Sequence, residues 1–236
     1  SLGGPADFYN EDLLYRLFGI NAELLIDHAW GWEPCTIAQI QSYKPSTNSL
    51  SSGQVLSTAY TFEKARLVVR EMTDNLVLEL VAKKLVTDRM TLSVGYDIEN
   101  LTDERRRLSY TGPVERDWYG REVPNPSHGS INLPHQSSST ELITDAVMRL
   151  FDRIVDKQLL VRRMYVVAER TVDESKMSGI QLDLFEETRI DPKERRRQEA
   201  ILAIKKYGRN AILKGMNFGD GATAIERNRQ VGGHKE

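Results

Sequence analysis

Cysteine is nearly absent from this chain: Cys35 is the only one among 236 residues. A single thiol allows no internal disulfide and no zinc site built on paired cysteines. The four histidines (His28, His128, His135 and His234) lie far apart and have no cysteine at metal-ligand spacing. The composition therefore excludes a disulfide scaffold and a zinc-finger protein, and it favours a reducing compartment.

Long hydrophobic runs are also missing. Charged residues interrupt each apolar stretch within a few positions, and no segment has the pattern of a signal peptide or a membrane-spanning helix. Hydrophobic residues still make up 40% of the chain, which is enough to build a core. We therefore expect a cytoplasmic protein without a membrane partner.

The chain has little net charge, −2 at pH 7, which by itself argues against nucleic-acid binding. The charge is unevenly distributed, however. Residues 1–60 carry a net charge of −4, whereas residues 189–236 carry +6. This asymmetry predicts a basic C-terminal tail on a mildly acidic body.

Hydrophobic periodicity predicts an α+β fold. Residues 10–31 have the pattern of two short helices that stop at Gly19 and Gly31, and residues 34–49 that of an irregular connector. The next part predicts a strand over 50–57, a helix over 62–84, strands over 89–98 and 129–133, a helix that begins near Ser138 and a strand over 161–169. Two helices then cover one face of a four-stranded sheet, in a βαββαβ order of the ferredoxin-like kind, and leave the other face open.

Two further segments lie outside this pattern. Residues 99–127 are polar, contain several glycines and prolines and are too long for a hairpin turn, so we expect a functional or disordered insertion. Residues 194–207 predict a basic amphipathic helix with Ala200, Ile201 and Ile204 as its apolar stripe. That helix is expected to lie on the body or on DNA.

The open face of the predicted sheet has the character of a phosphate-gripping surface. Alternation along residues 89–98 directs Met90, Leu92 and Val94 to one face and small residues to the other. Small hydroxyls, backbone N–H groups and a few arginines hold phosphates without reading bases. The candidate DNA-binding residues are Lys44, Ser51, Ser52, Gly53, Thr91, Ser93, Gly95, Arg105, Arg106, Arg107, Arg162 and Arg163. Alternation places only one of the last two on the open face, and the run at 105–107 has a solvated loop as its alternative interpretation.

The most specific pattern is the pentapeptide QLDLF, formed by Gln181, Leu182, Asp183, Leu184 and Phe185 after the break at Ser178-Gly179. As an extended peptide it presents two leucines and an aromatic ring to an apolar pocket. It resembles the bacterial sliding-clamp-binding motif, written QLxLF. The alternative is a short core strand, since Leu182 and Leu184 fall on one face at a period of two.

Other residues strengthen this resemblance. The stretch Leu17-Phe18-Gly19, Leu24 and Ala29-Trp30-Gly31 resembles the end of the thumb domain of Y-family translesion DNA polymerases of the UmuC/DNA polymerase IV type. The βαββαβ unit resembles their little-finger domain, which clasps duplex DNA. The resemblance implies a helical thumb remnant at 1–42, a linker at 43–49, a little finger at 50–172 with the insertion at 99–127, a clamp-binding segment at 173–188 and a basic tail at 189–236.

The resemblance also implies a function and partners. The chain is expected to be the DNA-binding and clamp-tethering region of an error-prone translesion polymerase in DNA repair and the SOS response, a monomer that binds duplex primer–template DNA and the sliding clamp. The alternative is a clamp-binding adaptor that does not touch DNA.

The catalytic half of such a polymerase is not recognisable in this sequence. In the family, the palm domain holds two Mg²⁺ ions with carboxylates from separate strands. Asp97 and Glu99 share a face at the end of a predicted strand, but they point to a polar loop, where solvated acids are common. We therefore expect no catalytic residue, cofactor or metal site in this chain and no nucleotidyl transfer by it alone.

Overall fold

The computed structural model describes residues 8–19, 22–33, 35–42, 48–117, 120–179 and 191–229. The chain divides into two units, residues 1–47 and 48–236, which we describe separately.

The first unit consists of short helices. The predicted pair is present as α1 (Phe8–Phe18) and α2 (Ala22–Ala29), which contact one another and bury Ala22. Gly19 follows α1 with a φ of 57°, a left-handed conformation that favours glycine and ends the helix. A third helix, α3 (Ile37–Ser42), forms where the sequence predicted an irregular connector.

The second unit has the predicted βαββαβ order. Its main elements are β1 (Leu50–Tyr60), α4 (Phe62–Ala82), β2 (Leu85–Tyr96), β5 (Ser127–Ser137), α7 (Thr140–Ile154) and β6 (Val161–Glu169). The strands lie in the order β1-β6-β2-β5 with antiparallel neighbours, and the short β7 (Val172–Asp173) pairs with the start of β2. In each βαβ unit, a strand of the other unit lies between the two strands: β6 lies between β1 and β2, and β2 lies between β6 and β5. Strands β2 and β6 therefore lie in the centre of the sheet.

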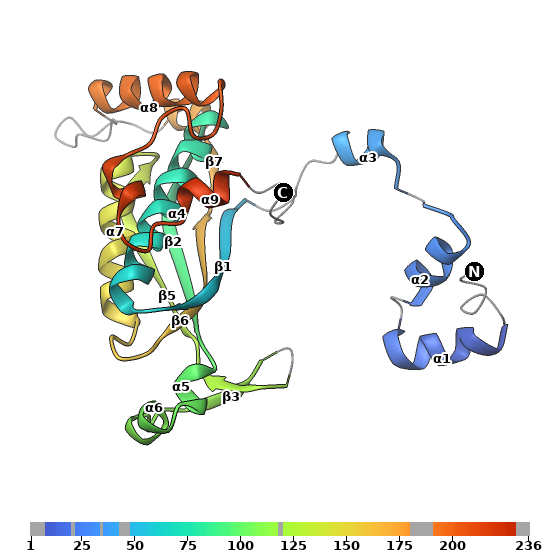
Figure 1. Cartoon of the computed structure of the whole chain (residues 1–236). Helices are drawn as coiled ribbons and strands as arrows, with labels where there is room; N and C mark the ends of the chain where they lie inside the picture. Colours follow the sequence, from blue (N-terminus) through green and yellow to red (C-terminus); the bar gives the residue numbers. More distant parts are fainter. Residues whose placement is uncertain are drawn as a thin grey trace. The chain divides into compact units, whose positions relative to one another are not determined.

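Helices α4 and α7 cover one face of this sheet (Figure 1). Their apolar sides meet the alternate residues of the central strands, as the sequence predicted. Fully buried members of this core are Met72, Leu76, Leu80, Met90, Leu92, Val94, Leu150, Phe151, Met164, Val166 and Ala168. The opposite face carries exposed side chains, among them Val55 and Tyr165.

The insertion after β2 is folded, so of the two expectations, a functional or a disordered insertion, its described residues exclude the disordered one. It forms α5 (Glu99–Thr102), α6 (Glu104–Ser109) and a hairpin of β3 (Val114–Arg116) and β4 (Glu122–Pro124), beyond one end of the sheet (Figure 1). The buried Asn100 anchors it: its amide nitrogen donates to Asp97 O and Leu160 O, each at 2.9 Å, and its oxygen accepts from Leu160 N at 2.8 Å. Such short elements lack the periodicity by which sequence patterns are read.

The basic tail packs on the helical layer. It forms α8 (Pro192–Lys205), the 3-10 turn η3 (Gly215–Phe218) and α9 (Ala224–Asn228), all in contact with α4. Glu71 of α4, buried, accepts hydrogen bonds from Asn217 Nδ2 (2.7 Å), Thr223 N (2.8 Å) and Ala224 N (3.1 Å). This carboxylate holds the tail against the helices.

Helix α8 forms where it was predicted, but its inward face is polar. Glu194 and Gln198 are buried, whereas Ala200 and Ile204 of the predicted apolar stripe are exposed. Glu194 accepts from Ser139 Oγ (2.8 Å) and Thr140 N (2.7 Å) at the start of α7. Ile201 is half-buried, so the predicted stripe was wrong for Ala200 and Ile204. The free N–H groups at the start of α7 instead bind the Glu194 carboxylate and direct this side of α8 inward.

Candidate nucleic-acid interface

The register of the four strands defines the open face, the side of the sheet away from α4 and α7. Its residues alternate with the buried ones and lie in rows across the strands. They are Ser51, Gly53 and Val55 of β1; Arg163, Tyr165, Val167 and Glu169 of β6; Arg89, Thr91, Ser93 and Gly95 of β2; and His128, Ser130 and Asn132 of β5.

Two glycines on this face make room for large neighbours on β6. A Cβ atom on Gly95 would lie 2.6 Å from both Cγ and Nε of Arg163, and one on Gly53 would lie 2.6 Å from Cδ1 and Cε1 of Tyr165. The sequence made Gly95 a candidate DNA-binding residue, and a glycine leaves space above the strand. In the structure, that space is filled by the Arg163 side chain, which therefore lies flat across the sheet.

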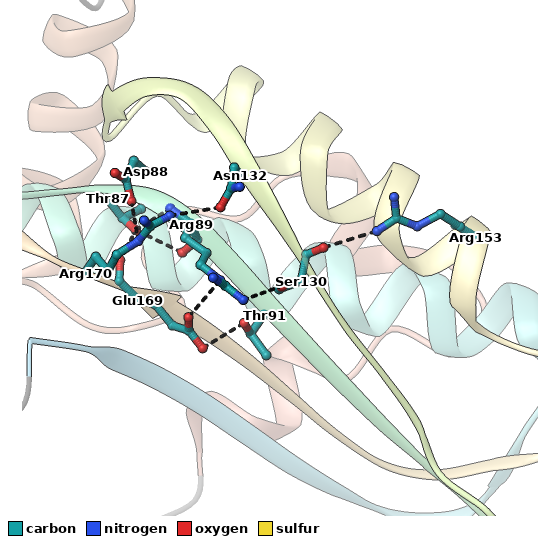
Figure 2. Close-up of polar contacts among 9 residues, drawn as sticks. All are labelled: Thr87, Asp88, Arg89, Thr91, Ser130, Asn132, Arg153, Glu169 and Arg170. Carbon is teal, nitrogen blue, oxygen red and sulfur yellow. Dashed lines mark hydrogen bonds and ion pairs between the residues drawn. The ribbon is translucent and has the colours of Figure 1, made fainter.

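A polar cluster occupies one corner of the open face, at the start of β2 (Figure 2). Arg89 Nε lies 3.1 Å from Glu169 Oε2, and Arg89 Nη2 donates to Ser130 Oγ at 2.8 Å. Thr91 Oγ1 donates to the second carboxylate oxygen, Glu169 Oε1, at 2.8 Å. We call these four residues the Arg89 cluster.

Further arginines surround the Arg89 cluster. Arg170 pairs with Asp88 (Nε to Oδ1, 3.0 Å) and donates to Asn132 Oδ1 at 2.9 Å. Arg153 reaches from α7 to the carbonyl oxygen of Ser130 at 3.2 Å (Figure 2). The corner drawn in Figure 2 thus holds three arginines against two carboxylates, a net positive charge that suits a polyanion.

The structure brings half of the predicted DNA-binding residues together. Ser51, Gly53, Thr91, Ser93, Gly95 and Arg163 lie on the open face. Ser52 does not lie on the open face: it pairs with the buried Val166 and so belongs to the helix-covered side.

The other predicted arginines lie elsewhere. Arg162 sits in an irregularity of β6, where it donates to Ser57 O at 3.0 Å and pairs with Asp97 at 3.5 Å. Arg105, Arg106 and Arg107 belong to α6 in the insertion, and Arg106 donates to Gln158 O at 3.3 Å. Lys44 lies outside the described residues.

Sequence reasoning missed Arg89, His128, Ser130 and Glu169. Arg89 and Glu169 have the same parity along their strands as Thr91 and Arg163, so alternation alone would have found them. His128 and Ser130 were less accessible to prediction, because only the β2–β5 register shows which residues of β5 face outward.

The pentapeptide Gln181–Phe185 also lies outside the described residues. Its flanks are described: the 3-10 helix η2 (Glu174–Gly179) precedes it and α8 follows it. An ion pair between Glu174 and Arg195 joins these two flanks.

Asp97 has a structural role at the end of β2. Its Oδ1 accepts from Glu99 N at 2.8 Å and so starts α5, while Glu99 itself is exposed. Across the described residues, no three His, Cys, Asp or Glu side chains gather closely enough to hold a metal ion. Nor is any helix in those ranges long and apolar enough to cross a membrane.

Comparison with known proteins identifies the fold. Residues 47–184 match the model of the impB/mucB/samB family C-terminal domain, a span that contains the whole sheet with α4 and α7. A search of curated proteins finds no match. The family match covers more than half of the 236 residues. The chain therefore belongs to the impB/mucB/samB family and carries the C-terminal region of a UmuC-type, Y-family DNA polymerase.

Proposed function

We propose that this chain is the DNA-gripping and clamp-tethering region of an error-prone translesion polymerase that acts in the cytoplasm during DNA repair. The observation that carries the proposal is the open face: a sheet backed by two helices presents hydroxyls, glycines and arginines to the outside. The family membership supports a polymerase context.

The chemistry of the open face favours phosphate binding over base reading. Arg163 lies flat on the sheet, and among the described residues no carboxylate pairs with it. Ser51 and Ser93 offer short hydroxyl donors that do not project far enough to enter a groove. A surface of this kind holds duplex DNA with little sequence preference, and its affinity falls with salt because cations are released from the DNA.

The clamp-tethering part of the proposal rests on the pentapeptide. Gln181 hydrogen-bonds the rim of an apolar pocket on the clamp, and Leu182, Leu184 and Phe185 fill it. The clamp then keeps the polymerase on primer–template DNA. Nucleotide transfer, with its Mg²⁺ ions, belongs to the palm domain of the parent enzyme.

Duplex binding by the purified chain tests the proposal. Affinity should fall steeply between low and moderate salt, and Arg163→Ala should weaken all sequences alike while lowering the salt slope by about 1. Arg149→Ala is the matched control, because Arg149 is an exposed arginine of α7 on the other side of the sheet. A chain that binds the clamp but shows no salt-dependent duplex affinity would instead be the clamp adaptor.

A further inference from the structure

The Arg89 cluster contains a carboxylate where a DNA-binding surface needs phosphate. Glu169 presents one oxygen to the Arg89 guanidinium and the other to the Thr91 hydroxyl (Figure 2). A phosphodiester likewise presents two anionic oxygens from one atom, and guanidinium and hydroxyl groups bind both kinds of anion. The carboxylate thus has the chemistry of a phosphate substitute.

The carboxylate is held loosely compared with a structural ion pair of the same unit. Arg66 donates to both oxygens of Asp152, at 2.7 and 2.9 Å, in the bidentate arrangement typical of a strong pair. Arg89 Nε lies 3.1 Å from Glu169 Oε2 but makes no hydrogen bond, although the atom is buried. A buried donor without a directed acceptor is costly, so an anion placed to accept from it would be favoured.

Two members of the cluster are partly accessible, whereas Thr91 is buried. The side chain of Arg89 is 39% exposed and that of Glu169 36% exposed. Ser130 Oγ accepts from Arg89, which leaves its own hydroxyl proton available to a further acceptor. Removal of the carboxylate would therefore leave a guanidinium and two hydroxyls around one position on the open face.

We infer that the Arg89 cluster is a phosphate-binding subsite for the DNA backbone, and that Glu169 occupies it in the free protein and is displaced by a phosphate on binding. This inference rests on the proposed DNA-binding role of the open face. This exchange keeps the affinity for DNA low. Each binding event replaces one anion by another at Arg89, so the binding free energy is less favourable than it would be with an unpaired arginine. Low affinity suits a surface that must release DNA of any sequence.

Glu169→Gln tests the inference, because it removes the charge and keeps the shape. The variant should bind duplex about tenfold more tightly at moderate salt, with a salt slope steeper by about 0.9, since one more cation becomes available to phosphate. Asp145→Asn is the charge-matched control, as Asp145 is exposed on α7 behind the sheet. In the background of Arg89→Gln, the gain from Glu169→Gln should vanish.

The outcomes separate this inference from the proposed function. If the unmodified chain shows no salt-dependent duplex binding, both the DNA-binding role of the open face and the phosphate subsite are wrong. Salt-dependent binding that Arg163→Ala weakens, with Glu169→Gln equal to the Asp145→Asn control, would overturn the subsite alone. A second readout uses the unmodified chain and is independent of any variant's folding: the Nε–H resonance of Arg89 should shift when duplex is added in an NMR titration. An unchanged resonance at saturating duplex would also overturn the subsite.

Discussion

At the residue scale, the open face depends on what is small as much as on what is charged. Arg163 and Tyr165 lie across the sheet because Gly95 and Gly53 have no side chains in their way. A long flexible cation gains directional strength when its neighbours restrict its conformations, since less entropy is lost on binding. Gly95 therefore positions Arg163, and Gly53 positions Tyr165.

Substitution of Gly95 by alanine tests this positioning. The new Cβ would lie 2.6 Å from Arg163 atoms, so the arginine must leave its place on the sheet. We expect weaker duplex binding and a loss of about 1–3 kcal/mol of unfolding free energy, because Cγ at the base of the arginine side chain must also shift. Fluorescence anisotropy with labelled duplex measures the effect. In the Arg163→Ala background the alanine should have no further effect, and an additive loss would contradict the positioning role.

At the element scale, α4 makes polar links besides its apolar contacts with the sheet. Arg66 joins it to Asp152 of α7, and the buried Glu71 joins it to the tail. These links add to the packing that attaches α7 and the tail to α4.

The Arg66–Asp152 pair gives a pH dependence with a defined sign. Its hydrogen bonds from Arg66 lower the pKa of Asp152 below the ordinary value of 3.8. A depressed carboxyl pKa stabilises the fold above the unfolded-state pKa, and the contribution is lost as pH falls through the folded-state pKa. The unfolding free energies of the unmodified chain and of Asp152→Asn should therefore differ at neutral pH and converge below about pH 4. If the two unfolding free energies still differ in acid, the difference comes from packing and not from the charge of Asp152.

Glu71→Ala should release the tail. The substitution removes the shared acceptor of Asn217, Thr223 and Ala224 and leaves their donors unpaired, at a cost of about 2–4 kcal/mol. Hydrogen exchange at the Thr223 and Ala224 amides should accelerate before the sheet amides do. Glu79→Ala is the control, because Glu79 lies on the same helix but is exposed and pairs only with Lys83 in the described part of the chain. Equal effects of the two variants would contradict the anchoring role of Glu71.

The elements also differ in how far the sequence predicted them. Helices α4 and α7 and the strand β2 were predictable because each carries a long periodic pattern that the core enforces, as in Met90, Leu92 and Val94. The polar strands β1 and β5 were predicted only in part, over 50–57 and 129–133. The buried side of α8 was not predictable from the sequence. Glu194 and Gln198 are buried because they form hydrogen bonds at the start of α7, and hydrophobic periodicity does not reveal such bonds. The Arg89 cluster depends on pairing between β2, β5 and β6. The sequence shows which face of its own strand each residue occupies, but not which residues lie side by side on neighbouring strands.

At the scale of the whole molecule, the chain combines a sheet proposed to bind DNA with a peptide proposed to bind the clamp. These two activities should be separable, since the open face and the pentapeptide share no residues. Separation would distinguish a tethered DNA-binding region from a single composite surface.

Replacement of both Leu184 and Phe185 by alanine tests that separation. Each side chain should contribute about 2 kcal/mol or more to clamp binding, so the double variant should lose it. Duplex affinity and the thermal midpoint should stay nearly unchanged. Calorimetry with the purified clamp and a thermal melt give both measurements. Unfolding of the variant, or normal clamp binding, would show that the pentapeptide is a core strand.

The ion pair between Glu174 and Arg195 joins the two described flanks of the pentapeptide, which belong to the same unit. Two residue steps separate Gly179, the last residue of η2, from Gln181, and an extended chain spans at most about 7 Å in that distance. A clamp that binds Gln181 would therefore lie directly beside the unit that carries the sheet, and not at the far end of a long linker.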